Sequence, residues 1–562
     1  MPHITRSWYL STGPSCGVVP TAHGALWDAN FNDVCEKIHA EDIARDPSLA
    51  NRTTFVCDQD FSQTIPPADY ISIDLPRCLS LSPGWEKSRI ETPSQWAGPL
   101  IGFLVPSLGF IISIPRETTL PQPGRGIGRK WYISLWWAFI NLLSLLFDTL
   151  WGIAFVFGWA GPYIAGALHE TFVDRAILKK VYRNLKDPIH RPSGSEWFAL
   201  AISLVGSFDP EVRESRNHNT FAELVKQELS QRETARLLLK QSCTQLVPFG
   251  VQVGVPLVFY VGASIYSLVD AQARLGDNDT AHSIAFGLWY NTIVLVAITS
   301  SMVLSVGAGR VIESVMAKHR LTEKGYKLKS ICERRWELWK WSKQRLPNSY
   351  GPNAAQVPLN AGYADIFDQH YAKRSALIAV IILVVPWTLA FLVSYLTPEI
   401  GVSCRSATVM AYAISQLLLI FLWYFHSSPD VRHKRHNAQA LGHTVRRFGY
   451  WLLSALYYVV GSISMVVTVA GTIMQLVGVY RNCVCKAGLY YGLPTTPFAA
   501  VATAQVKLST DTQLDRDQAH NWMLLGGCGI IWLVFVCAVA GWHRVRMRQR
   551  CLQLIDDLAG IP

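Results

Sequence analysis

Eight long apolar runs are the feature that most constrains how this chain folds. A helix needs about 20 apolar residues to cross a bilayer core about 30 Å thick. The runs reach about that length or exceed it: Trp96–Ile114, Trp131–Leu168, Leu246–Val269, Ile284–Ala308, Ala376–Leu396, Ala407–Phe425, Tyr450–Tyr480 and Trp522–Trp542. Strands that are not closed into a barrel leave backbone groups unsatisfied in lipid, so each run is expected to be helical. The sequence predicts an all-α integral membrane protein.

The second run is too long for one ordinary span. Its middle holds Gly158-Trp159-Ala160-Gly161-Pro162, which is a turn signal. One interpretation is a helix, a turn and then a second or re-entrant span. The other is a single tilted helix that continues out of the bilayer.

Basic residues concentrate in alternate loops. Segments 115–130, 309–374, 427–449 and the tail after Trp542 carry an excess of Lys and Arg, whereas 270–281 and 397–405 do not. By the positive-inside rule the basic segments are cytosolic. This places the N-terminus outside and the C-terminus inside, which requires an odd number of crossings. We therefore expect nine spans, or eight if 131–168 crosses only once.

These assignments divide the chain into five parts. They are an extracytosolic N-terminal region (1–95), a first membrane part (96–308) with a cytosolic loop (169–243), a cytosolic amphipathic loop (309–374), a second membrane part (375–542) and a cytosolic basic tail (543–562). The net charge of +11 then lies on the cytosolic membrane face. The lipid bilayer is the partner that explains this charge, and no nucleic acid is expected to bind. A plasma or secretory-pathway membrane is expected.

Cysteines support an outside N-terminus. No apolar segment follows Met1, so no cleavable signal peptide is predicted. The N-terminal region holds four cysteines, and an even number in an extracytosolic segment indicates two disulfides with three possible pairings. The four are Cys16, Cys35, Cys57 and Cys78. Farther along, Cys483 or Cys485 is expected to pair with Cys404.

Glycosylation sequons agree with the same orientation. Asn51-Arg52-Thr53 and Asn278-Asp279-Thr280 both fall in segments that the charge pattern places outside. Asn51 is the better acceptor, because Asn278 lies close to two membrane ends.

Two acidic residues are candidates for chemistry. Asp148 lies inside an apolar run, where a carboxylate is costly and therefore suggests function. Glu170, with His169, follows the same run and could line one cavity with Asp148. Two buried acids would allow proton-initiated cyclisation of a lipophilic substrate.

Metal and cofactor sites are not predicted. The best metal candidate is a histidine group next to a span, but Arg432, Lys434 and Arg435 would oppose a bound cation there. The group comprises His426, His433, His436 and His443. No Gly-rich phosphate loop is present, and no cofactor is expected.

Two other segments stand out. Gly250 and Gly254 form a GxxxG pair in the third run, which together with the Ser- and Thr-rich fourth run is our candidate for the lining of a cavity. Residues Arg310–Arg345 are expected to form an amphipathic helix whose Trp and Arg side chains anchor it in the headgroup layer. A lipid- or partner-binding role is the alternative.

The stretches Gly13–Cys35 and Gln95-Trp-Ala-Gly-Pro-Leu-Ile-Gly resemble uncharacterised polytopic membrane proteins of filamentous fungi. Some of these are encoded near secondary-metabolite genes. The resemblance implies no catalytic residues.

Three functions are compatible with the sequence. The first is a carrier of a small molecule or secondary metabolite. The second is a membrane-embedded biosynthetic enzyme acting on a lipophilic substrate. The third is a receptor or scaffold that senses through its N-terminal region. The carrier is favoured, because no catalytic group of residues is visible.

Overall fold

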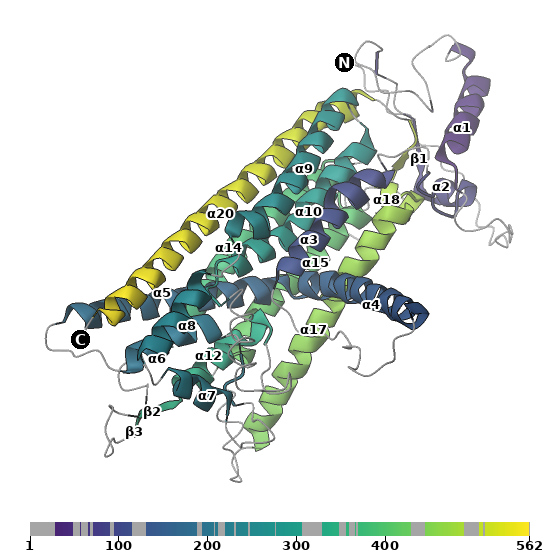
Figure 1. Cartoon of the computed structure of the whole chain (residues 1–562). Coiled ribbons are helices and arrows are strands. Elements are labelled where there is room, and N and C mark those ends of the chain that lie inside the picture. The colour runs from purple at the N-terminus through teal and green to yellow at the C-terminus, as the bar shows by residue number, and fades with distance from the viewer. Residues whose placement is uncertain are drawn as a thin grey trace.

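The computed structural model is a bundle of long helices with a small disulfide-bonded unit at one end (Figure 1). It describes residues 29–48, 57, 66–67, 71–89, 95–114, 131–187, 194–206, 208–211, 220–229, 232–244, 248–275, 277–305, 329–347, 356–358, 366, 369–398, 400–428, 444–487, 505–509 and 512–560.

The helices occupy most of these residues. They are α1 (Phe31–Arg45), α2 (Leu75–Leu81), η3 (Gly98–Leu104), α3 (Val105–Ser113), α4 (Trp131–Gly158), α5 (Ala160–Lys186), α6 (Gly194–Val205), α7 (Phe221–Glu228), α8 (Arg232–Thr244), η4 (Gly250–Gly254), α9 (Val255–Ala273), α10 (Asn278–Ser301), η6 (Ile331–Glu333), α12 (Arg334–Ser342), α14 (Gln369–Tyr395), α15 (Cys404–His426), α17 (Thr444–Val477), α18 (Cys483–Lys486) and α20 (Gln513–Ala559). Strands β1 (Ser72–Asp74) and β4 (Gln505–Lys507) pair antiparallel, as do β2 (Arg345–Pro347) and β3 (Gln356–Pro358).

Six helices of the described chain are long and apolar enough to cross a membrane. They are η4 with α9, then α10, α14, α15, α17 and α20. Consecutive members of this set run in opposite directions, so the ends of α9, α14 and α17 lie at one end of the bundle. Two contacts join these ends: Asn278 Nδ2 donates to Pro398 O at 3.3 Å, and Arg481 lies 3.8 Å from Asp279. The prediction of a helical membrane protein is supported.

The structure does not confirm nine spans. The first apolar run forms η3 and α3, whose apolar part, Gly98–Ile112, is shorter than a span. The helix stops at Ser113 because Pro115 disfavours helical geometry at Ile114, whose ψ is 125°. The second run forms α4 and α5, which count at most as one broken span, giving seven.

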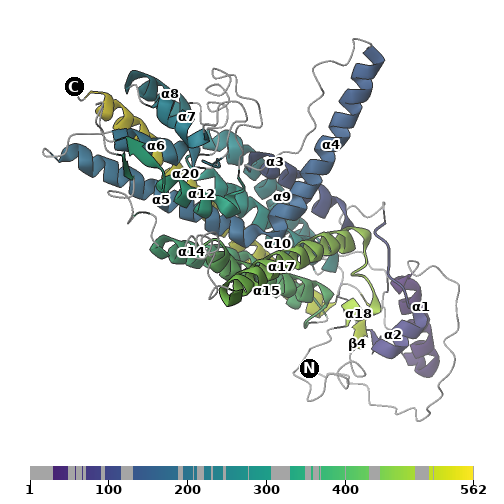
Figure 2. The ribbon, with the colours of Figure 1, turned by 90° about the horizontal axis from the view of Figure 1, so that it is seen from below.

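The second run breaks within its turn signal. Helices α4 and α5 meet at Trp159 with a bend of 80°, so they form neither a tight hairpin nor one straight helix. Gln416 of α15 satisfies the interrupted backbone: its Oε1 accepts from Gly161 N and its Nε2 donates to Gly158 O, both at 2.8 Å. Beyond the bend, α4 leaves the bundle sideways (Figure 2).

Helix α10 forms the centre of the bundle. Of its apolar window, 94% is buried, and α14, α20, α5, α9 and α3 surround it. Its polar side chains and backbone bond to neighbouring helices. Trp387 Nε1 donates to Thr292 Oγ1 at 3.1 Å, and Tyr260 OH donates to Gly287 O at 2.5 Å. The Ser- and Thr-rich fourth run is therefore mainly a packing element.

A second apolar core lies at the end of the bundle opposite the disulfides. Helices α6 and α8, the end of α5 and the last turns of α20 build it. Helix α20 has 47 residues and is about 70 Å long at 1.5 Å per residue, so it passes through both cores. In this second core Cys243 Sγ and Cys551 Sγ lie 3.0 Å apart without a bond. At its surface, Lys240 Nζ lies 2.9 Å from the exposed Asp556 carboxylate.

Three disulfides hold the small unit at the other end, which contains α1, α2, α18 and the β1–β4 pair. The bonds are Cys35–Cys57, Cys78–Cys483 and Cys404–Cys485. The expectation of two bonds confined to the N-terminal region is therefore corrected, since Cys78 pairs with Cys483 after α17. Cys16 and Asn51 lie outside the described residues.

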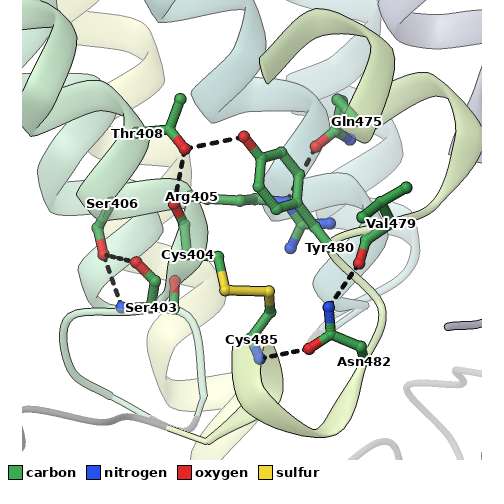
Figure 3. The surroundings of a disulfide bond; sticks show 10 residues. All are labelled: Ser403, Cys404, Arg405, Ser406, Thr408, Gln475, Val479, Tyr480, Asn482 and Cys485. Atoms are coloured by element: carbon green, nitrogen blue, oxygen red, sulfur yellow. Dashed lines mark hydrogen bonds between the residues drawn. A yellow bond between two sulfur atoms is a disulfide. The ribbon is translucent and has the colours of Figure 1, made fainter. Parts of the chain in front are cut away.

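Of the two expected partners of Cys404, Cys483 and Cys485, the structure pairs it with Cys485 (Figure 3). The bond joins the first residue of α15 to the segment that follows α17. Polar contacts surround it: Arg405 Nε donates to Gln475 Oε1, and the Thr408 and Tyr480 hydroxyls are hydrogen-bonded, each at 2.9 Å. The ends of α15 and α17 are thus fixed both covalently and by hydrogen bonds.

Replacing Cys404 and Cys485 together by Ser should lower the free energy of unfolding by about 4 kcal/mol, because the bond closes a loop of 81 residues. Denaturant unfolding in detergent measures this. Cys528→Ser, at an exposed free cysteine, is the control and should change little.

Mass spectrometry of unreduced peptides should recover the Cys78–Cys483 pair, and finding Cys78 joined to Cys35 or Cys57 would contradict the fold of the disulfide-bonded unit.

Candidate functional site

A groove of about 940 Å³ runs between η3–α3 and α9 on the side of the bundle. Small residues let the two helices approach closely at its floor: a Cβ on Gly102 would lie 3.1 Å from Ala263, and one on Gly109 would lie 3.5 Å from Pro256. Gly262 faces open space in the groove. The long walls are apolar, and they include Ile101, Val105, Val255, Val258 and Phe259.

The GxxxG pair, Gly250 and Gly254, does not line the groove, although the sequence predicted that it would line a cavity. Nothing lies within 4 Å of a Cβ built on Gly250 or Gly254, so this pair mediates no close helix contact in the described chain. Both residues belong to the π-helical turn η4 that leads into α9. The third run does line the groove, but it does so through Pro256, Gly262 and their neighbours.

One end of the groove is charged. Arg274 Nε lies 3.3 Å from Asp270 Oδ1, and Arg274 Nη1 lies 3.9 Å from Asp277 Oδ2. Asp277 caps α10 by accepting from Asp279 N at 2.9 Å. Burial, and then the neighbouring Asp279 carboxylate, raise the pKa of Asp277 to about 7. The groove therefore combines an apolar body with a polar end, as an amphiphilic ligand would require.

Glu170 lies in a separate, fully buried polar cluster. Its Oε2 accepts from Arg334 Nη1 and its Oε1 accepts from Ser305 Oγ, each at 2.6 Å. One helical turn farther along α5, Asp174 Oδ2 accepts from Leu304 N at 3.4 Å. The cluster joins α5, α12 and the end of α10. A carboxylate with both oxygens engaged in this way is a structural anchor.

Much of the described part of the predicted amphipathic loop is buried, whereas Trp336 and Trp339 are half-buried and Lys343 is exposed. Arg335 Nη1 donates to Tyr424 O at 2.8 Å, Lys340 Nζ lies 3.0 Å from Asp209, and Trp341 Nε1 donates to Phe208 O at 2.9 Å. Several polar groups of α12 are therefore satisfied by protein. The expectation that residues Arg310–Arg345 anchor in the headgroup layer stays a prediction, since residues 310–328 lie outside the described residues.

Asp148 and Glu170 do not share a cavity. Asp148 is half-buried on α4 and Glu170 is buried on α5, on opposite sides of the 80° bend. The pair proposed for cyclisation is therefore not assembled in the described structure.

The glycosylation candidate Asn278 is half-buried as the first residue of α10, and its Nδ2 donates to Pro398 O.

The histidine group is only partly described. His426 is buried, and its ring stacks on Tyr457 at 4.8 Å. His433, His436 and His443 lie outside the described residues. Within the described ranges, no three His, Cys, Asp or Glu side chains are placed to hold a metal ion.

Comparison with protein-family models, curated protein sequences and solved structures gave no match. The candidate site is therefore interpreted from its own geometry. Sequence reasoning identified Glu170 but not its partner Arg334, and it missed the pairing of Asp270 with Arg274. A sequence signal for the second pair existed, because Asp and Arg four residues apart share one face of a helix.

Glu170→Gln should lower the free energy of unfolding by about 3–5 kcal/mol, because it leaves Arg334 buried without its counter-ion. Chemical denaturation in detergent measures the change. Glu233→Gln is the control, since Glu233 lies in an exposed pair with Arg236 and should cost at most about 1 kcal/mol. Equal losses of unfolding free energy in the two variants would show that the buried pair stabilises the protein no more than the exposed pair does.

Asp277→Asn should make the protein less sensitive to pH. The folded protein retains the Asp277 proton up to about pH 7, whereas the unfolded chain releases it near its ordinary pKa of 3.8. Stability is therefore lost as pH rises through this window. Asn still caps the helix, so the thermal midpoint of wild type should fall relative to the variant between about pH 4 and about pH 7. Parallel melting curves would contradict the raised pKa of Asp277.

Proposed function

We propose that this protein binds a small lipophilic molecule from the bilayer in the groove between η3–α3 and α9, and that it is a carrier. The observation that supports this most is the shape and chemistry of the groove. Its walls are exposed apolar side chains, with Val258 71% and Phe259 69% accessible. Such a surface is unfavourable in water, whereas lipid covers it readily and supplies lipophilic ligands laterally.

The expected orientation has support from sulfur chemistry. All three disulfides lie at one end of the bundle, and disulfides persist in oxidising compartments. The unbonded Cys243 and Cys551 thiols lie at the other end, with the basic residues of the end of α20. We infer that the disulfide end is extracytosolic in a plasma or secretory-pathway membrane, with the C-terminus in the cytosol.

The alternatives have less support. A biosynthetic enzyme would need free acids, but Arg334 and Ser305 engage both oxygens of Glu170. A receptor is favoured by one observation, the covalent link of the disulfide-bonded unit to α15 and α17. The resemblance to fungal proteins suggests a secondary metabolite as the substrate of the carrier.

Gly262→Leu tests the proposal. A Cβ on Gly262 meets nothing within 4 Å, so the Leu side chain fills the groove without a clash. We expect a fluorescent long-chain alcohol to bind at least tenfold more weakly to the variant in nanodiscs, a change of about 1.4 kcal/mol. In proteoliposomes, movement of the same probe between leaflets should fall in parallel.

Gly527→Leu is the matched control. Gly527 lies on α20 outside the groove, and its Cβ would also meet nothing within 4 Å. Both variants raise helix propensity equally, so only the filling of the groove differs between them. Equal binding and equal flux in the two variants would rule out the groove as the site.

A further inference from the structure

The charged end of the groove has more acid than base. Arg274 faces two carboxylates, Asp270 and Asp277, at 3.3 and 3.9 Å. Asp279, the other acid of this segment, lies 3.8 Å from Arg481 and so has a separate partner. Above about pH 7, where Asp277 has lost its proton, one carboxylate is therefore in excess where the groove ends, and the binding test below is made at about pH 8. The Asp270 side chain is 20% accessible and lines the groove, so a ligand can reach it.

The hydroxyl groups at this end present acceptors. Ser267 Oγ donates its proton to Ala263 O at 3.1 Å, and Thr280 Oγ1 donates to Asp277 O at 2.7 Å. Each hydroxyl then has only lone pairs left to offer a ligand. With the Asp270 carboxylate, three lining side chains present acceptors, and the lining hydroxyls of Tyr266 and Ser283 can donate or accept. The one charged donor among the lining residues, Arg274, already faces two carboxylates.

We infer that the groove takes an amphiphile whose polar head is a positively charged amine, with that head against Asp270 and the apolar body along α3 and α9. The inference rests on the proposed function and specifies its substrate class. An ammonium group has donors and no acceptors, which matches this lining. An anionic head would have to draw Arg274 away from both carboxylates, leaving them unpaired at the edge of an apolar groove.

Four probes with the same alkyl chain test the charge preference. An alkylamine, an alcohol, a sulfate and a phosphocholine compete with the fluorescent alcohol for the protein in nanodiscs. We expect the alkylamine to bind about tenfold more tightly than the alcohol, and the sulfate to bind most weakly. Tighter binding of the phosphocholine than of the amine would overturn the inference and indicate a site for bilayer phospholipid.

Asp270→Asn locates the preference. The variant should reduce the affinity for the alkylamine to that for the alcohol. Asp517→Asn, an exposed acid on α20 outside the groove, is the matched control and should keep the preference. Equal weakening of all four probes by Asp270→Asn, or no preference in wild type, would overturn the inference.

The experiments distinguish failure of the proposed binding site from failure of the proposed preference for an amine. If the alcohol binds and Gly262→Leu abolishes its binding, the groove is the site regardless of the charge result. If the alcohol binds equally to the Gly262→Leu and Gly527→Leu variants, the groove itself is wrong and the amine inference falls with it.

Discussion

The satisfaction of backbone groups at the bend between α4 and α5 is the constraint on which the rest of the structure depends. A broken helix inside an apolar bundle leaves amide and carbonyl groups without partners, and each costs free energy if it stays unpaired. The Gln416 side chain supplies both an acceptor and a donor at this point. The break then directs α5 along the bundle and places Glu170 opposite Arg334. A polar residue in an apolar span thus determines where the buried ion pair forms.

Burial of α10 explains why the groove lies at the periphery. Because α10 packs on nearly all sides, Thr292 bonds to Trp387 of α14, while Thr299 and Ser301 bond to carbonyl groups of α10 itself. The small residues that allow close approach instead lie where α3 meets α9. Tight packing is therefore concentrated around α10 at the centre, whereas the groove, and the ligand binding that we propose for it, lie at the edge.

Much of this arrangement could be predicted from the sequence, but mainly its local part. Apolar length identified the helices, and the Gly158–Pro162 signal identified the position of the bend. The expected placement of Cys404, Cys483 and Cys485 on one side of the membrane predicted that Cys404 pairs with Cys483 or Cys485, and the structure selects Cys485. The partner of Glu170 did not follow, because Arg334 lies 164 residues away and hydropathy contains no pairing information. For the same reason Cys78 was assigned a neighbour within its own region.

The sequence separation of the paired cysteines determines the order in which the disulfides can form during synthesis of the chain. Cys35 and Cys57 are 22 residues apart and can join as soon as both enter the oxidising compartment. Cys78 and Cys483 are 405 residues apart, so Cys78 must wait as a thiol while nearly the whole chain is translated and inserted. During that interval it is open to exchange with the wrong cysteine. Under the orientation that we propose, correct maturation of the disulfide-bonded unit therefore requires Cys78 to stay available until Cys483 reaches the same compartment.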